Sequence, residues 1–402
     1  MKKFPIPFVV SALVLLTAFV LFAIWGIPYF FHPSPIVYNG STYGSQTTRA
    51  RVTQIIEEGQ ITLGEHKQAY QVLRVELLEG EYKGILMEVD YGKRQLRSDT
   101  NRFVAGDEIY VLIGKDLNGL LTANYVEYVR TNSLLILLGV FVSAIILMGR
   151  WKGVGSLLAL AFSMLMIVSY IIPHILAGED PLRVSLIGST ILLGTTLYMT
   201  YGWNLKTHAS VLSMVLVLLL TGLLSAFFVS LTRLTGSGQE DTLFLIQFSS
   251  VSINLRGLLL GGMIIGALGV LDDLVSAQSA AVFEIYDANP ALGFRRIFDK
   301  SMRIGQDHVA ATVNTLVLAY AGASLPLLLL FTLGSGNYGF LFNVGFMAEE
   351  IVRTLVGSLG LIAAVPITSL IATALALYGD RLGEWRILLG PETGDGEHGH
   401  SH

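Results

Sequence analysis

The sequence predicts a polytopic α-helical membrane protein of about eight spans, with a small extracellular all-β, OB-like barrel domain after the first span. Two observations lead to this prediction. Of the 402 residues, 52% are hydrophobic and only 14% are charged, whereas soluble domains carry about 25% charged residues. Apolar runs near the length of about 20 residues that a bilayer requires also recur along the chain. The composition therefore excludes an ordinary soluble enzyme.

The first apolar run, residues 8–27, follows Lys2 and Lys3. It resembles a signal peptide, but it is long for the apolar core of one, and no small-x-small cleavage site follows in residues 27–31. We therefore expect an uncleaved signal anchor, with an N-terminal anchor segment over residues 1–32.

The hydrophobic period changes to two between residues 38 and 130, which is typical of half-buried strands. The five segments with this pattern are 49–55, 70–77, 84–89, 108–113 and 125–129. Five short strands separated by turns predict a barrel of the oligonucleotide-binding-fold kind over residues 33–131. Basic and acidic residues balance along this domain, so no nucleic-acid partner is expected. A structural module, or one that faces a partner protein, fits better than a ligand-binding module.

A seven-span helical membrane domain is predicted for residues 132–378, followed by a tail over 379–402. The expected spans are 134–148, 154–175, 184–200, 211–231, 258–274, 309–331 and 354–377. Basic residues of short loops lie preferentially in the cytoplasm. With Lys2 and Lys3 inside, the densest basic cluster (Arg295, Arg296, Lys300 and Arg303) is also inside. Both termini are therefore expected in the cytoplasm and residues 33–131 outside.

Ionisable residues inside apolar runs are costly and by default functional. Asp272 and Asp273 end the predicted span 258–274. If the helix ends at Leu274, they lie at the cytoplasmic surface; if it continues through the apolar residues 280–285, they lie near its middle. Gly262, Gly266 and Gly269 precede them at helical spacing and predict a smooth strip for a neighbouring helix.

A second polar group opens the span 309–331. Asp307 and Asn314 are seven residues apart, and His308, Thr312 and Thr315 form another stripe, so both stripes are expected on faces that avoid lipid. Such a group is able to coordinate a cation through oxygen ligands or to relay a proton. The alternative is structural: Asp307 caps the helix, His308 is an interfacial residue, and the pair Asp272 and Asp273 meets Arg295 or Arg296.

Other features give weaker indications. Glu349, Glu350 and Arg353 precede the last span and predict an interfacial pair at i,i+3 spacing. The three histidines of the tail, His398, His400 and His402, are a possible metal site. The sequence contains no zinc-protease, serine-hydrolase or phosphate-loop motif, so neither an enzyme nor a bound cofactor is expected, apart from a coupling cation of unknown identity.

Two motifs resemble the YibE/F family of bacterial membrane proteins. The first is residues 262–273, GMIIGALGVLDD, followed by Gln278 and by AVFE at 281–284. The second is residues 305–320, GQDHVAATVNTLVLAY. The resemblance implies a multi-pass protein of the bacterial cell membrane and assigns no substrate. The two motifs contain the six candidate residues of a transport or ion site, which are Asp272, Asp273, Gln278, Asp307, His308 and Asn314.

These observations favour a secondary transporter or permease that moves an unknown small solute or ion and is coupled to a cation or proton. The alternative from a different class is a non-transporting membrane sensor or assembly factor that acts through its extracellular β-domain.

Overall fold

The computed structural model of the chain describes residues 47–63, 66–93, 102–115, 120–248, 251–333, 338–379 and 389. The predicted signal anchor and the histidines of the tail lie outside these residues. The chain falls into two units: one covers residues 38–148, and the other holds the helices from Gly149 onward.

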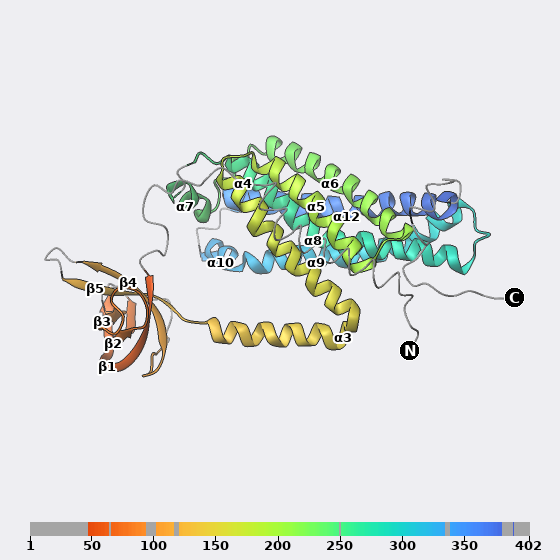
Figure 1. Cartoon of the computed structure of the whole chain (residues 1–402). Helices are drawn as coiled ribbons and strands as arrows, with labels where there is room; N and C mark the ends of the chain where they lie inside the picture. The colour runs from red at the N-terminus through yellow and green to blue at the C-terminus, as the bar shows by residue number, and fades with distance from the viewer. Residues whose placement is uncertain are drawn as a thin grey trace. The chain divides into compact units, whose positions relative to one another are not determined.

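The first unit contains a closed five-stranded barrel, which confirms the predicted all-β domain (Figure 1). Its strands are β1 (Thr47–Leu63), β2 (His66–Leu77), β3 (Leu86–Tyr91), β4 (Glu108–Lys115) and β5 (Leu121–Tyr128). Their order around the barrel is β1-β2-β3-β5-β4. β3 pairs with β5 in parallel, and the other neighbours pair antiparallel.

The inward-facing side chains of the barrel follow the period of two that the sequence predicted. Leu73, Val75 and Leu77 of β2 are each 0% exposed and alternate with partly exposed neighbours. The core contains a group of aromatic side chains: the Tyr91 ring lies 4.8 Å from that of Phe103 and 4.9 Å from that of Tyr125. Edge-to-face contacts of this kind add stability beyond the apolar area that they bury.

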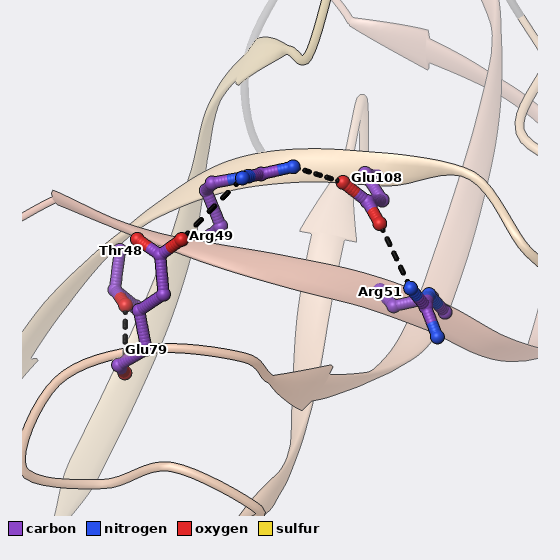
Figure 2. Close-up of polar contacts among 5 residues, drawn as sticks. All are labelled: Thr48, Arg49, Arg51, Glu79 and Glu108. Atoms are coloured by element: carbon purple, nitrogen blue, oxygen red, sulfur yellow. Dashed lines mark hydrogen bonds and ion pairs between the residues drawn. The ribbon is translucent and has the colours of Figure 1, made fainter.

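A chain of ion pairs lies on the seam between β1 and β4 (Figure 2). Glu108 accepts hydrogen bonds from Arg51 at 2.9 Å and from Arg49 at 2.5 Å, and Arg49 also contacts Glu79 at 3.4 Å. The Arg51 and Arg49 guanidinium groups hold the pKa of the Glu108 carboxyl below its usual value. Because β1 and β4 are far apart in the sequence, this cluster joins the two strands that close the barrel.

The second unit is helical. Its elements are the part of α3 (Thr131–Met166) after Met148, the π-helix η2 (Ile167–Ile171), α4 (Ile172–Leu176), α5 (Pro181–Tyr201), α6 (Leu205–Leu231), α7 (Glu240–Phe248), α8 (Leu255–Ala288), α9 (Phe294–Ala323), α10 (Leu325–Leu333), α11 (Tyr338–Leu341) and α12 (Gly345–Tyr378). α3 is interrupted at Arg150, whose φ of 49° and ψ of −128° are not helical. Within the bundle, α8 packs against α5, α6, α9 and α12.

Six helices of the described chain are long and apolar enough to cross a membrane: Thr131–Arg150, Gly153–Leu176, Pro181–Tyr201, Leu205–Leu231, Leu255–Ala288 and Gly345–Tyr378. The count of about eight spans is therefore not confirmed. The first predicted span lies outside the described residues. The predicted span 309–331 is divided at Ser324 between α9 and α10, and the charged first half of α9 lowers the apolar content of that helix.

The length of α8 decides whether the helix ends at Leu274 or continues beyond it, which the sequence left open. It begins at its N-cap Asn254, whose side chain accepts a hydrogen bond from the Gly257 amide at 3.0 Å, and it runs without a break to Ala288. The helix therefore continues past Leu274. Asp272 and Asp273 lie in its middle rather than at its end.

Candidate functional site

Asp272 is positioned by the length of α8. Any run of about 20 residues that lies wholly within this helix includes residues 269–274. Any stretch of α8 long enough to cross a membrane therefore includes Asp272. Its side chain is half-buried, and its Oδ1 atom is buried without a hydrogen-bond partner among the described residues. Taking a charged carboxylate out of water without a partner is energetically costly.

Asp273 lies on a different side of the helix and is exposed. Its backbone carbonyl accepts a hydrogen bond from the Ser276 hydroxyl at 3.1 Å. Ser276 is in turn 3.2 Å from the Tyr201 hydroxyl at the end of α5. The two neighbouring aspartates thus have different surroundings, and Asp272 is the one that the bundle encloses.

Gln278 joins three helices and is 2% exposed. Its Nε2 atom donates to the Ser301 carbonyl of α9 at 2.9 Å and to the Ser369 hydroxyl of α12 at 2.7 Å. On α9, Gly305 faces the same amide: a Cβ at this position would lie 2.8 Å from Gln278 Oε1 and would overlap Val365 of α12. The lack of a side chain at Gly305 therefore allows α8, α9 and α12 to meet at Gln278.

The structure separates the candidate residues of α9 by face. Ser301 and Gly305 are buried against the bundle and His308 is half-buried, whereas Asp307 and Asn314 are exposed. The Thr312 hydroxyl donates to the His308 carbonyl at 2.8 Å, so it satisfies the backbone of its own helix. Of the second predicted stripe, His308 and Thr312 are half-buried and Thr315 is exposed, so the described residues do not cover the two stripes equally.

The described residues contain no group of three or more His, Asp or Glu side chains that could hold a metal ion. The glycine strip also differs from the prediction. A Cβ at Gly262 or Gly269 would meet no atom of the described chain, and one at Gly266 would lie 3.4 Å from the Tyr320 hydroxyl of α9. The close helix contact of α8 is instead at Gly261, where a Cβ would overlap Ser185 of α5.

A buried carboxylate at the start of α12 was not predicted. The expected pair of Glu350 and Arg353 is present at 3.0 Å, but it lies inside α12 rather than before it. Glu349 is 2% exposed and accepts a hydrogen bond from the Gly238 amide at 3.1 Å, which fixes the loop after α6. Its spacing from Val352 and Val356, three and seven residues on, was the available signal that it shares their buried face.

A recess of the barrel lies between β1, β2, the end of β3 and the segment that precedes β4. It is lined by Glu58, Gly59, Gln60, Ala69, Tyr70, Gln71, Tyr91 and Arg102 and has a volume of about 140 Å³. Pockets for small molecules measure about 300–1,000 Å³. Gln71, one of the lining residues, also has a structural role, because it exchanges hydrogen bonds with the Phe103 backbone at 2.8 and 3.3 Å. The recess does not indicate a ligand.

A comparison with protein-family models matches residues 137–377 to a family described as YibE/F-like protein. The match covers more than half of the chain, begins within α3 and ends in the last turn of α12, so the barrel lies outside it. No curated protein and no solved structure matches the chain.

Proposed function

The chain belongs to the YibE/F-like family, and from that premise we propose that it is a secondary transporter or permease of the bacterial plasma membrane. The six apolar helices that are able to cross a membrane support its place in a bilayer. In this proposal the helices α8, α9 and α12 surround the path of a small solute or ion, and transport is coupled to a proton or a cation.

The observation that carries the proposal is the Oδ1 atom of Asp272 in the middle of α8, which is buried and has no hydrogen-bond partner among the described residues. A carboxylate in such surroundings favours any state in which its charge is neutralised. Binding a proton or a small cation neutralises it, and release restores the charge. A group that changes its charge in this way at membrane depth is what coupled transporters use.

The surrounding donor set favours a proton over a divalent cation. Divalent cations such as Ca²⁺ take six to eight oxygen ligands, often from several carboxylates. Among the described residues, no third carboxylate or histidine joins Asp272 and Asp273 in a group of that kind. A single half-buried carboxylate is sufficient to carry a proton.

The full-length protein, reconstituted in liposomes on a solid-supported membrane, tests this proposal. We expect a jump in external pH to produce a transient current in the wild type and none in Asp272→Asn. A matched control is Asp287→Asn, which removes an exposed carboxylate from the last turn of the same helix and is expected to keep the current. Wild-type currents in Asp272→Asn, or no response of the wild type to a pH or Na⁺ jump, would contradict the proposal.

We also propose that the barrel is OB-like and that it lies outside the cell. The strand order β1-β2-β3-β5-β4, with β3 and β5 parallel, supports an OB-like barrel. The basic cluster in the first turns of α9, Arg295, Arg296, Lys300 and Arg303, supports a cytoplasmic position for the α8–α9 connection. That orientation places the barrel outside and both termini in the cytoplasm.

The second candidate function is a membrane sensor or assembly factor that acts through the barrel and a partner protein. It is favoured by one observation: the barrel is closed, with a core of its own, and is separate from the helical unit. Deleting residues 38–130 distinguishes the two functions. If the deletion variant keeps the pH-driven current, the transport proposal is supported. If the wild type shows no such current and a specific co-purifying protein is lost when the barrel is deleted, the second function is supported.

A further inference from the structure

One side of α9 carries residues that the bundle does not cover. Arg303, Asp307, Ala310, Asn314, Val317 and Ala321, called here the outward stripe, are all exposed. They recur at alternating spacings of four and three residues, which is the seam along which two parallel helices pack as a coiled coil. The opposite side of α9, at Ile297, Ser301 and Gly305, is buried in the bundle.

The contacts of α9 place the middle of the outward stripe, from Asp307 to Val317, at the depth of the membrane spans. Gly305 lies against Gln278 of α8 and Val365 of α12. Further along, Tyr320 approaches Gly266 of α8, where a Cβ would lie 3.4 Å from its hydroxyl. Gln278 and Gly266 lie on either side of residues 269–274, the part of α8 that any spanning stretch includes. Asp307 and Asn314 lie between Gly305 and Tyr320 and are therefore at the same depth.

The polar members of the outward stripe have no compensating partner among the described residues. Arg303, Asp307 and Asn314 make no hydrogen bond or ion pair through their side chains with the other described residues. Polar side chains at this depth face protein or water rather than lipid tails. Asp307 and Asn314 are therefore expected to face protein or water.

We propose that the outward stripe is the interface with a second copy of this chain. The other apolar segments of the chain do not supply what the stripe needs, because residues 8–27 and 134–148 contain no charged residue. A second copy does. Two copies in one membrane share the same orientation, so their α9 helices pack in parallel about a two-fold axis.

The charges of the outward stripe are self-complementary in that arrangement. Asn314 of each copy lies at the seam, where paired asparagines hydrogen-bond and fix the register of two helices. Arg303 of one copy lies one turn from Asp307 of the other, so two ion pairs form symmetrically across the axis. Ala310, between these polar positions, has a small side chain that permits close approach of the helices.

The chain contains no cysteine, so a single introduced cysteine reports this interface without background. In native membranes treated with a mild oxidant, we expect Ala310→Cys to form a reducible dimer at twice the 43.7 kDa of the chain. The matched control is Leu219→Cys, which is 50% exposed on α6, and it is expected to remain monomeric. Size-exclusion chromatography of each variant checks that it is folded.

Charge variants in the Ala310→Cys background test the pairing itself. Arg303→Asp leaves only acidic charge on the outward stripe, and Asp307→Arg leaves only basic charge. Each variant alone is expected to lose most of its cross-linking, and co-expression of the two with different tags is expected to restore a mixed dimer. The proposal would be overturned if Ala310→Cys formed no dimer. It would also be overturned if each charge variant cross-linked to its own copies as efficiently as to the opposite variant. A disulfide within one chain of the double variant Ala310→Cys, Thr17→Cys would also overturn the proposal. It would show that residues 8–27 of the same chain pack against the outward stripe.

Discussion

Gln278 of α8 and Ser369 of α12 are joined by a hydrogen bond of 2.7 Å between Nε2 and Oγ, and both residues are almost fully buried, at 2% and 0% exposure. The same amide reaches the Ser301 carbonyl of α9 at 2.9 Å. One side chain therefore links the three helices on which the candidate site depends. Gln278 follows Asp273 by five residues in α8.

Gln278→Met is expected to lower the stability of the helical unit. The substitution keeps the length of the side chain, but it leaves the Ser301 carbonyl and the Ser369 hydroxyl without their partner. An unsatisfied buried polar group costs about 1–3 kcal/mol. Thermal unfolding in detergent measures the change. Gln306→Met, at an exposed position of α9, is the control and should stay within about 0.5 kcal/mol of the wild type; equal effects of the two variants would contradict the role of Gln278.

Gly305→Ala is expected to separate the same helices. The new Cβ overlaps Val365 and lies 2.8 Å from Gln278 Oε1, so α9 must move outward. Overpacking of this kind costs about 1–3 kcal/mol. In contrast, a Cβ at Gly194 of α5 meets no atom of the described chain, so Gly194→Ala should be neutral or stabilising by up to about 1 kcal/mol through helix propensity. Unfolding midpoints of both variants are compared with that of the wild type, and an unchanged midpoint in Gly305→Ala would argue against close packing there.

The sequence was informative wherever local periodicity decides the structure. Alternating apolar residues identified all five strands of the barrel, because each strand needs one buried face. The ion pairs of Glu108 with Arg49 and Arg51 were not predictable in the same way. They depend on the register between β1 and β4, which is set by closure of the barrel rather than by local sequence.

The candidate site was predicted in part for the same reason. Spacing along α9 indicates that Asp307 and Asn314 share one side of the helix, but it does not say what covers that side. The sequence did not settle whether Asp272 lies in the middle or at the end of α8, because that depends on whether the helix continues past Leu274. Two adjacent aspartates lower the local hydropathy, so by hydropathy alone the apolar stretch ends at them. Gln278 was identified only through the family resemblance, since its role depends on contacts with Ser301 and Ser369.

Asp272→Leu is expected to raise the stability of the helical unit. The wild-type side chain buries an oxygen atom that has no hydrogen-bond partner in the part of the chain that the structure describes, and removing such a group recovers about 1–3 kcal/mol. Replacing a functional residue commonly stabilises a protein, because such a residue is kept for activity at the expense of stability. The unfolding midpoint in detergent is the measurement, with Asp287→Leu as the exposed control on the same helix. A lower midpoint for Asp272→Leu would show that the carboxyl group makes a stabilising interaction in the folded protein.

The barrel is expected to lose stability in acid. Hydrogen bonds from Arg51 and Arg49 lower the pKa of Glu108 below its usual value of 4.5. A group whose pKa is lower in the folded state stabilises that state above the unfolded pKa, and this contribution is lost as the pH falls through the folded pKa. Protection of β1 and β4 from hydrogen exchange should therefore decrease when the pH is lowered from 7 to below about 4.

Glu108→Gln isolates the contribution of this carboxylate. We expect its β1 and β4 peptides to exchange a few-fold faster than those of the wild type at pH 7, because the ion pairs with Arg51 and Arg49 are lost. The additional loss of protection at acid pH should be smaller than in the wild type. Hydrogen–deuterium exchange of the full-length protein, corrected for the intrinsic rate at each pH, measures both effects. Glu81→Gln, in the turn after β2 and without an ion pair among the described residues, should keep the wild-type pH dependence. If Glu108→Gln keeps it as well, other carboxylates control the acid sensitivity of the barrel.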